Sequence, residues 1–117
     1  MASGHVTVVV SVDPEVSHRA GEAIRIALGL VASGSDVTLA FLGPAAKVLD
    51  PEVAEYVDGE DVVKHVTTLK NLGLPFHVDR AVIRDEAGWN AAGVRVVPLG
   101  RAELAHLIAT SARILTF

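Results

Sequence analysis

Residues 5–34, HVTVVVSVDPEVSHRAGEAIRIALGLVASG, decide the fold of this chain. Val6–Val12 is β-branched and almost continuously apolar, which is typical of a strand buried on both faces of a sheet. Asp13 and Pro14 interrupt the run, and we expect them to be the N-cap and the first residue of a helix. An alanine-rich apolar stripe then recurs at helical spacing until Gly34, which ends the helix. The stretch therefore predicts one strand followed by one long helix.

The rest of the chain continues this alternation. The expected strands are 36–42, 74–79, 94–97 and 112–117, and the expected helices are a short one from Asp50 to about Asp58 and longer ones at 60–72 and 101–110. Residues 84–93 are the most polar stretch and are expected to form a loop or a turn or two of helix. Such alternation predicts an α/β three-layer sandwich around a mostly parallel five-stranded sheet, with the first strand placed centrally. We expect one domain over residues 1–117.

Composition excludes several classes of function. Ten basic and fourteen acidic residues give a net charge of −4, which is not the basic footprint of a nucleic-acid binder. No apolar run approaches the roughly 20 residues that cross a bilayer, and no signal sequence is recognisable, so we expect a cytoplasmic protein that contacts neither nucleic acid nor membrane. The sequence contains no cysteine, which rules out disulfides, thiolate nucleophiles and thiolate metal sites.

Chemistry in such a fold is expected at the carboxyl ends of the strands, because ligands bind there in open parallel sheets. The loops concerned are 13–18, 43–47, 77–84 and 98–101, and no catalytic residue is assigned in them. The candidate residues for a ligand or partner site are Asp13, His18, Pro44, His77, Asp79, Arg80 and Trp89. No glycine-rich phosphate motif and no metal-binding histidine motif is present, so neither a cofactor nor a metal is expected.

Each candidate also has a purely structural interpretation. Asp13 can be a helix cap, and His18 can be a solvated residue on a polar helix face. His77 and Asp79 project to the same side of a strand, where a hydrogen bond between them is favoured over a ligand site. Trp89 can contact a partner or fold over the sheet edge. Gly21 and Gly29 each weaken the first helix and indicate close packing against the sheet or a partner.

The order and spacing of these segments carry a family resemblance. The segments are LVASG at 30–34, DVTLAF at 36–41 with GPA at 43–45, LKNLGLP at 69–75, GVRVV at 93–97 and SARILTF at 111–117. The chain resembles the DsrE/DsrF/DsrH-like family of small sulfur-relay proteins, which includes the Tus sulfur-transfer subunits. The resemblance implies a single α/β/α domain that assembles as a homo-oligomer, or as a hetero-oligomer with a related subunit.

The same resemblance argues against sulfur transfer by this chain. Sulfur-transferring members carry a persulfide-forming cysteine just after the third strand, and by spacing that position falls at about Asp79, give or take one residue. A carboxylate cannot carry a sulfane sulfur, whereas cysteine-free subunits of the family serve as assembly partners. We therefore expect a non-catalytic oligomeric subunit whose interface includes Trp89, His65 and the C-terminal strand. The alternative is a small-molecule binding module or a cysteine-independent enzyme that uses Asp13, His77, Asp79 and Arg80.

Overall fold

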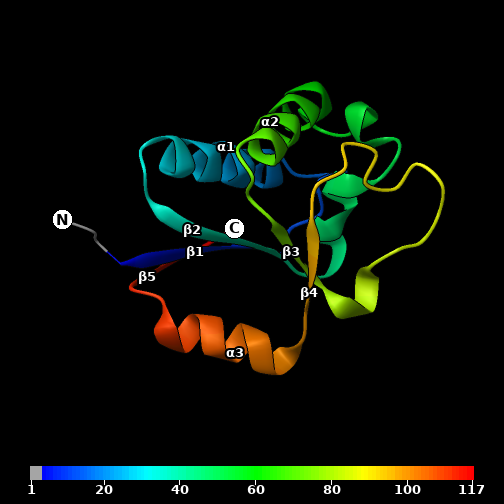
Figure 1. Ribbon diagram of the computed structural model, residues 1–117. Helices are drawn as coiled ribbons and strands as arrows, with labels where there is room; N and C mark the ends of the chain where they lie inside the picture. Colours follow the sequence, from blue (N-terminus) through cyan, green and yellow to red (C-terminus); the bar gives the residue numbers. More distant parts are fainter. Residues whose placement is uncertain (1–3) are drawn as a thin grey trace.

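The computed structural model describes residues 4–117, in which five strands alternate with three α-helices (Figure 1). The strands are β1 (His5–Val10), β2 (Asp36–Phe41), β3 (Phe76–Asp79), β4 (Val96–Leu99) and β5 (Arg113–Thr116). The α-helices are α1 (Arg19–Ala32), α2 (Gly59–Asn71) and α3 (Arg101–Thr110). Three short 3₁₀ helices follow β2 and β3, namely η1 (Gly43–Leu49), η2 (Val53–Glu55) and η3 (Arg80–Val82).

The strands form one sheet in the order β4-β3-β2-β1-β5, and every pairing in it is parallel. Helices α1 and α2 lie on one face of the sheet and α3 lies on the other (Figure 1). These features confirm the predicted α/β three-layer sandwich. Strand β1 is an interior strand, as its continuous apolar run predicts, while β2 occupies the middle of the sheet.

The two faces of the sheet are packed unequally. Alternate strand residues such as Val8, Leu39, Phe41 and Phe76 form the core with α1 and α2, and the rings of Phe41 and Phe76 stack with centroids 5.1 Å apart. The opposite face presents polar residues, including the buried Thr7 and Thr38. It is covered by α3, in which no residue is buried. This face is therefore the less completely covered of the two.

The helix start predicted at Asp13-Pro14 is wrong, because α1 begins at Arg19. The Asp13 carboxylate accepts a hydrogen bond from the Glu15 backbone N–H, and the Asp13 carbonyl accepts one from that of Ser17. Asp13 thus closes a separate turn, as Asp side chains commonly do, before the helix starts.

Smaller differences occur in the second half of the chain. The helix expected from Asp50 is reduced to η2, and β4 lies two residues later than predicted, at Val96–Leu99. Pro98 lies inside β4, which is tolerated because β4 is an edge strand and one of its sides needs no hydrogen-bond donor. The polar stretch 84–93 forms turns, as expected.

The two helix glycines have different surroundings. A Cβ atom on Gly21 would lie 3.2 Å from Cγ2 of Val62, so α1 and α2 approach closely there. A Cβ atom on Gly29 would meet nothing within 4 Å. Close packing is therefore confirmed for Gly21, but its neighbour is helix α2 and not the sheet or a partner, whereas within the described chain nothing packs closely on Gly29.

Candidate functional site

The Asp79 side chain links the carboxyl ends of β2 and β3, which lie at the candidate site. Its Oδ2 accepts a hydrogen bond from the Gly43 backbone N–H at 3.2 Å, and its Oδ1 accepts one from that of Ala81 at 3.0 Å. The second bond caps η3, so the carboxylate anchors the loops that follow β2 and β3. Both oxygens of Asp79 therefore have partners in the main chain.

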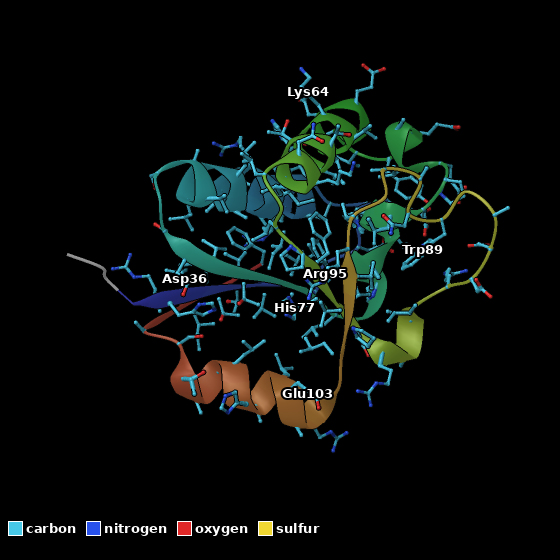
Figure 2. The ribbon with its side chains drawn as sticks, in the orientation of Figure 1. Asp36, Lys64, His77, Trp89, Arg95 and Glu103 are labelled. Atoms are coloured by element: carbon cyan, nitrogen blue, oxygen red, sulfur yellow. The ribbon has the colours of Figure 1, made fainter. Side chains whose placement is uncertain are left out.

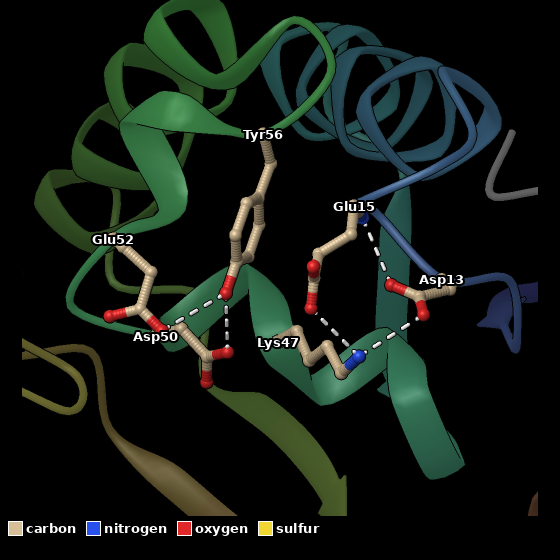
Figure 3. A network of polar contacts seen from close by, with 6 residues as sticks. All are labelled: Asp13, Glu15, Lys47, Asp50, Glu52 and Tyr56. Carbon is tan, nitrogen blue, oxygen red and sulfur yellow. Dashed lines mark hydrogen bonds and ion pairs between the residues drawn. The ribbon is translucent and has the colours of Figure 1, made fainter.

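Asp13 reaches the same edge through Lys47, a residue of η1. The Lys47 ammonium group lies 3.1 Å from Asp13 Oδ2 and 2.9 Å from Glu15 Oε1 (Figure 3). These two hydrogen bonds raise the pKa of Lys47, and the backbone N–H of Glu15, together with Lys47, lowers the pKa of Asp13. The network fixes η1 against the loop after β1, although the residues lie more than thirty positions apart.

Pro44 and Trp89 line one cavity at this edge, which we call the Trp89 cavity. It has a volume of about 260 Å³, and its wall also includes Lys47, Asp50, Val82 and Arg84. Trp89 is half-buried and packs against the core, beside the turns that follow β2 (Figure 2). The two cationic side chains in the wall of the cavity are already paired. Lys47 contacts Asp13 and Glu15, and Arg84 lies 3.5 Å from Glu86. The cavity therefore offers an apolar wall and an indole ring rather than an unpaired cation.

Asp79 and Arg80 line a different cavity of about 490 Å³ beneath the carboxyl ends of β2, β3 and β4. Arg101 and Leu104 of α3 contribute the opposite wall. The Arg80 guanidinium lies 3.7 Å from the carboxylate of Glu103, whose Oε1 also accepts the Gly100 backbone N–H at 2.7 Å. Arg80 is thus drawn towards the first turn of α3.

His77 lies between the sheet and α3 (Figure 2). Among residues 4–117 its Nδ1 has no hydrogen-bond partner, so the predicted hydrogen bond to Asp79 is wrong, although both residues line cavities on the α3 side. Burial lowers the pKa of His77, and the positive charge of Arg95 and the neighbouring His5 lower it further. His77 faces Ala102, His106 and Leu107 of α3 across an apolar groove.

His18 belongs to neither cavity at the sheet edge. It lies at the start of α1, exposed, in a polar depression that it shares with Asp58, Asp61 and His65. The structure thus brings Asp13, Pro44, Asp79, Arg80 and Trp89 to one edge of the sheet and leaves His18 and His77 elsewhere.

Four further residues of the site were not singled out in the sequence. Asp50 follows η1, and its Oδ2 accepts a hydrogen bond from the Tyr56 hydroxyl at 2.9 Å, while Glu52 lies 3.2 Å from the same hydroxyl (Figure 3). Burial raises the pKa of Asp50, and burial together with the Asp50 hydrogen bond raises that of Tyr56. Arg84 completes the set. From its Asp-Pro pair, a common helix-start signal, Asp50 was predicted to begin a helix.

The chemistry available at this edge is binding rather than a recognisable catalytic constellation. Over residues 4–117, no group of three or more His, Asp or Glu side chains has a geometry that could hold a metal ion. Nor does any helix in that range have the length and apolar character needed to cross a bilayer. Several ionisable groups near the cavities, among them Asp13, Lys47 and Asp79, are held by one another or by backbone N–H groups.

Comparison with known proteins places this arrangement in a family. The fold resembles that of the ychN protein from E. coli, with a TM-score of 0.69 over 97% of this chain and 99% of that chain at 17% sequence identity. No curated protein sequence matches this chain significantly. The model of the DsrE/DsrF-like family matches residues 4–117. Because this match covers nearly the whole sequence, the chain belongs to the DsrE/DsrF-like family.

Proposed function

We propose that this protein is an oligomeric DsrE-like subunit that serves as an assembly partner and does not itself carry sulfur. The observation that carries this proposal is the absence of cysteine from the sequence. The position where the resemblance places the transfer cysteine holds Asp79, whose two oxygens accept hydrogen bonds from Gly43 and Ala81. Because both carboxylate oxygens of Asp79 are engaged by backbone N–H groups, this position is better suited to a structural role than to sulfur transfer.

Assembly is supported by the incomplete covering of one side of the domain. No residue of α3 is buried. The apolar residues Ile108 of α3 and Ile114 of β5 are 47% and 36% exposed. Strand β5 is also an edge strand with one row of backbone groups available for pairing, whereas Pro98 interrupts such a row on the other edge. Members of this family generally form oligomers. We therefore place the interface with a second copy, or with a related subunit, at β5 and the adjoining side of α3.

Native mass spectrometry of the protein taken from its own cells tests the assembly. The expected mass is a multiple of the chain mass, or that mass combined with a related subunit. Ile114→Lys should shift the protein towards smaller species, because a charge on β5 would be buried in the interface. Val16→Lys is the matched control, since Val16 is 79% exposed on the loop after β1 and should leave the oligomer intact. A wild-type protein that stays monomeric at micromolar concentration would contradict the proposal.

Sulfur loading tests the second half of the proposal. After incubation with a persulfide donor, the wild-type chain should keep its mass, because no thiolate is present to accept a sulfur atom. Asp79→Cys is the positive control for the donor and should gain the mass of a sulfur atom. Stable sulfur uptake by the wild-type chain would show that the non-carrying role is wrong.

The Trp89 cavity favours a second candidate function, a small-molecule binding module at the carboxyl edge of the sheet. Two of the candidate residues, Pro44 and Trp89, line this cavity, which is mostly apolar and lies where ligands bind in open α/β sheets. Small molecules retained by the native protein would favour this function. Trp89→Leu should then reduce the retention of these molecules. If the binding site instead uses His77 and Asp79, then His77→Ala and Asp79→Ala should reduce it.

A further inference from the structure

A second apolar cavity lies beside the C-terminal end of η1. It has a volume of about 250 Å³ and is enclosed by η1, η2, α2 and residues 90–92. Its wall consists of valine, leucine, alanine and proline side chains with one asparagine, and Asp50 is the ionisable residue among them. An apolar cavity of about 150 Å³ suffices to hold benzene, so this cavity has room for a substituted ring or a short branched chain.

Asp50 lines both this cavity and the Trp89 cavity, and one of its carboxyl oxygens is unsatisfied among residues 4–117. Tyr56 donates to Oδ2 and thereby holds the carboxyl group in place (Figure 3). The other oxygen, Oδ1, is buried, and among residues 4–117 it has no hydrogen-bond partner. A buried acceptor without a donor is unfavourable, and a ligand that supplies the donor recovers much of that cost.

The surroundings of Asp50 allow a ligand to enter. Pro51, Ala54 and Ala91, which line the cavity, are exposed at the surface, and Val63 of α2 is 38% exposed beside them. Lys47 and Arg84 lie near enough to affect the charge on Asp50 but do not contact its carboxyl group within hydrogen-bonding distance. The site thus combines an apolar pocket, an accessible rim and one oriented acceptor, which is the usual make-up of a small-ligand site.

We propose that this cavity binds a small, mostly apolar molecule with one hydrogen-bond donor, a hydroxyl or a primary amine, which bonds to Asp50 Oδ1. The hydrocarbon part of the ligand fills the space between η2, α2 and residues 90–92. This inference is independent of the assembly proposed above, because neither α3 nor β5 contributes to the cavity.

Titration of the ¹⁵N-labelled protein with three matched probes, followed by NMR, tests the inference. Benzyl alcohol and benzylamine carry a donor, whereas toluene has a similar ring and no donor. At least one of the donor probes should cause saturable shifts of the amide signals of Val53, Ala54, Asn90, Ala91 and Ala92. Toluene should bind about tenfold more weakly, since one net hydrogen bond contributes about 1.4 kcal/mol. Binding of the alcohol alone or of the amine alone supports the proposal and assigns the donor as neutral or charged.

Two variants test the location and the role of Asp50. Ala92→Leu should fill the cavity and abolish binding, while Ala109→Leu on the exposed side of α3 is the matched control that leaves binding unchanged. Asp50→Asn keeps an acceptor for Tyr56 and should remove the preference for the donor probes over toluene. Circular dichroism verifies that each variant is folded, and binding is interpreted for folded variants.

Three results would overturn the proposal. The first is equal affinity for toluene and both donor probes, which would make the cavity merely apolar. The second is unchanged binding by folded Ala92→Leu. The third is the absence of saturable shifts at these amides up to about 10 mM probe, a concentration well above what a millimolar Kd requires. Monomeric or oligomeric behaviour of the protein affects none of these outcomes.

Discussion

Asp79 Oδ2 accepts a hydrogen bond from the Gly43 backbone N–H at 3.2 Å and so joins the loop after β2 to the end of β3. The register of the sheet makes this contact possible, since Phe41, two residues before Gly43, pairs with Val78, one residue before Asp79. Through its other oxygen, Asp79 also caps η3. One side chain thus positions the loops around both cavities at the strand ends.

Asp79→Ala should destabilise the protein by about 1–2 kcal/mol, because the substitution removes a cap and leaves two backbone N–H groups without their acceptor. Asp79→Asn should cost less, since its amide oxygen can accept one of the two bonds. Asp79→Cys should resemble the alanine variant. Equilibrium unfolding in urea measures all three. A loss below about 0.5 kcal/mol for Asp79→Ala would contradict the anchoring role.

Tyr56→Phe should lower stability by about 1 kcal/mol at neutral pH, because it removes the donor to the partly buried Asp50 carboxyl group. The folded state raises the pKa of Tyr56, so the contribution of its hydroxyl is complete below the unfolded value near pH 10 and is lost as the pH rises beyond it. The stability difference between the variant and wild type should therefore be constant from about pH 7 to pH 9 and shrink at higher pH. Tyr56 is the one tyrosine in the sequence, so ultraviolet difference absorbance follows its titration directly.

His77 should make stability depend on pH in the mildly acidic range. Its pKa is lowered by burial, Arg95 and His5, so the unfolded chain binds the proton more readily than the folded chain does. Stability should therefore fall as the pH decreases through and below about 6.5, the value for an unperturbed histidine. His77→Leu should weaken this dependence, and His18→Gln, at an exposed position, should preserve it. Urea unfolding at several pH values between about 5 and 8 measures the effect. Equal slopes for wild type and His77→Leu would contradict it.

Two glycine-to-alanine substitutions should have opposite effects. A Cβ atom on Gly59 would lie 2.2 Å from the Val53 carbonyl oxygen, so Gly59→Ala forces η2 and α2 apart. We expect a loss of about 2 kcal/mol or more, as for other overpacked positions. Gly29→Ala adds a methyl group in open space on α1 and should stabilise the monomeric fold by about 0.5–1 kcal/mol. Thermal unfolding of both variants gives the comparison, and a stabilised Gly59→Ala would show that the close contact is absent.

Gly29→Ala also reports on assembly. If the variant stabilises the chain but weakens the oligomer, the side of α1 that carries Gly29 lies in an interface. Close packing against a partner would then explain the glycine at this position. If the oligomer is unaffected, Gly29 lies outside the interface. Native mass spectrometry of the same sample distinguishes the two results.

The strands and α-helices were largely predictable because their signals are local. The apolar run at the start of the chain requires burial on both sides, and the alanine stripe of α1 requires one covered face. The strand and helix bounds agree with the structure to within about two residues at most positions, except where the helix expected from Asp50 is only the short η2 and where Asp13-Pro14 extended α1 too far. There, a local hydrogen bond from Glu15 to Asp13 favours a turn that the spacing of residues cannot distinguish from a helix start.

The candidate site was predictable only in part, because its contacts join residues distant in sequence. The rule that ligands bind at the carboxyl ends of parallel strands pointed to the loops of Asp13, Pro44, Asp79 and Arg80, which lie at one edge of the sheet, whereas Trp89 was selected as the one tryptophan, in a polar stretch. It could not separate the Trp89 cavity from the one beside Arg80, since that division depends on how η1 packs. Nor could it place His77, whose neighbours Arg95 and His106 come from later elements.

The sequence by itself determined the α/β class, the DsrE-like order of elements and the absence of a sulfur-carrying thiol, because periodicity and composition are properties of the chain alone. Only the tertiary structure decided the roles of Lys47 and Asp50. Lys47 acquires its role from Asp13 and Glu15 across more than thirty residues. Asp50 acquires a buried oxygen that is unpaired among residues 4–117 from the packing of η1 and Tyr56 around it. Burial and charge pairing arise when distant segments meet, and these two effects set the chemistry of both side chains.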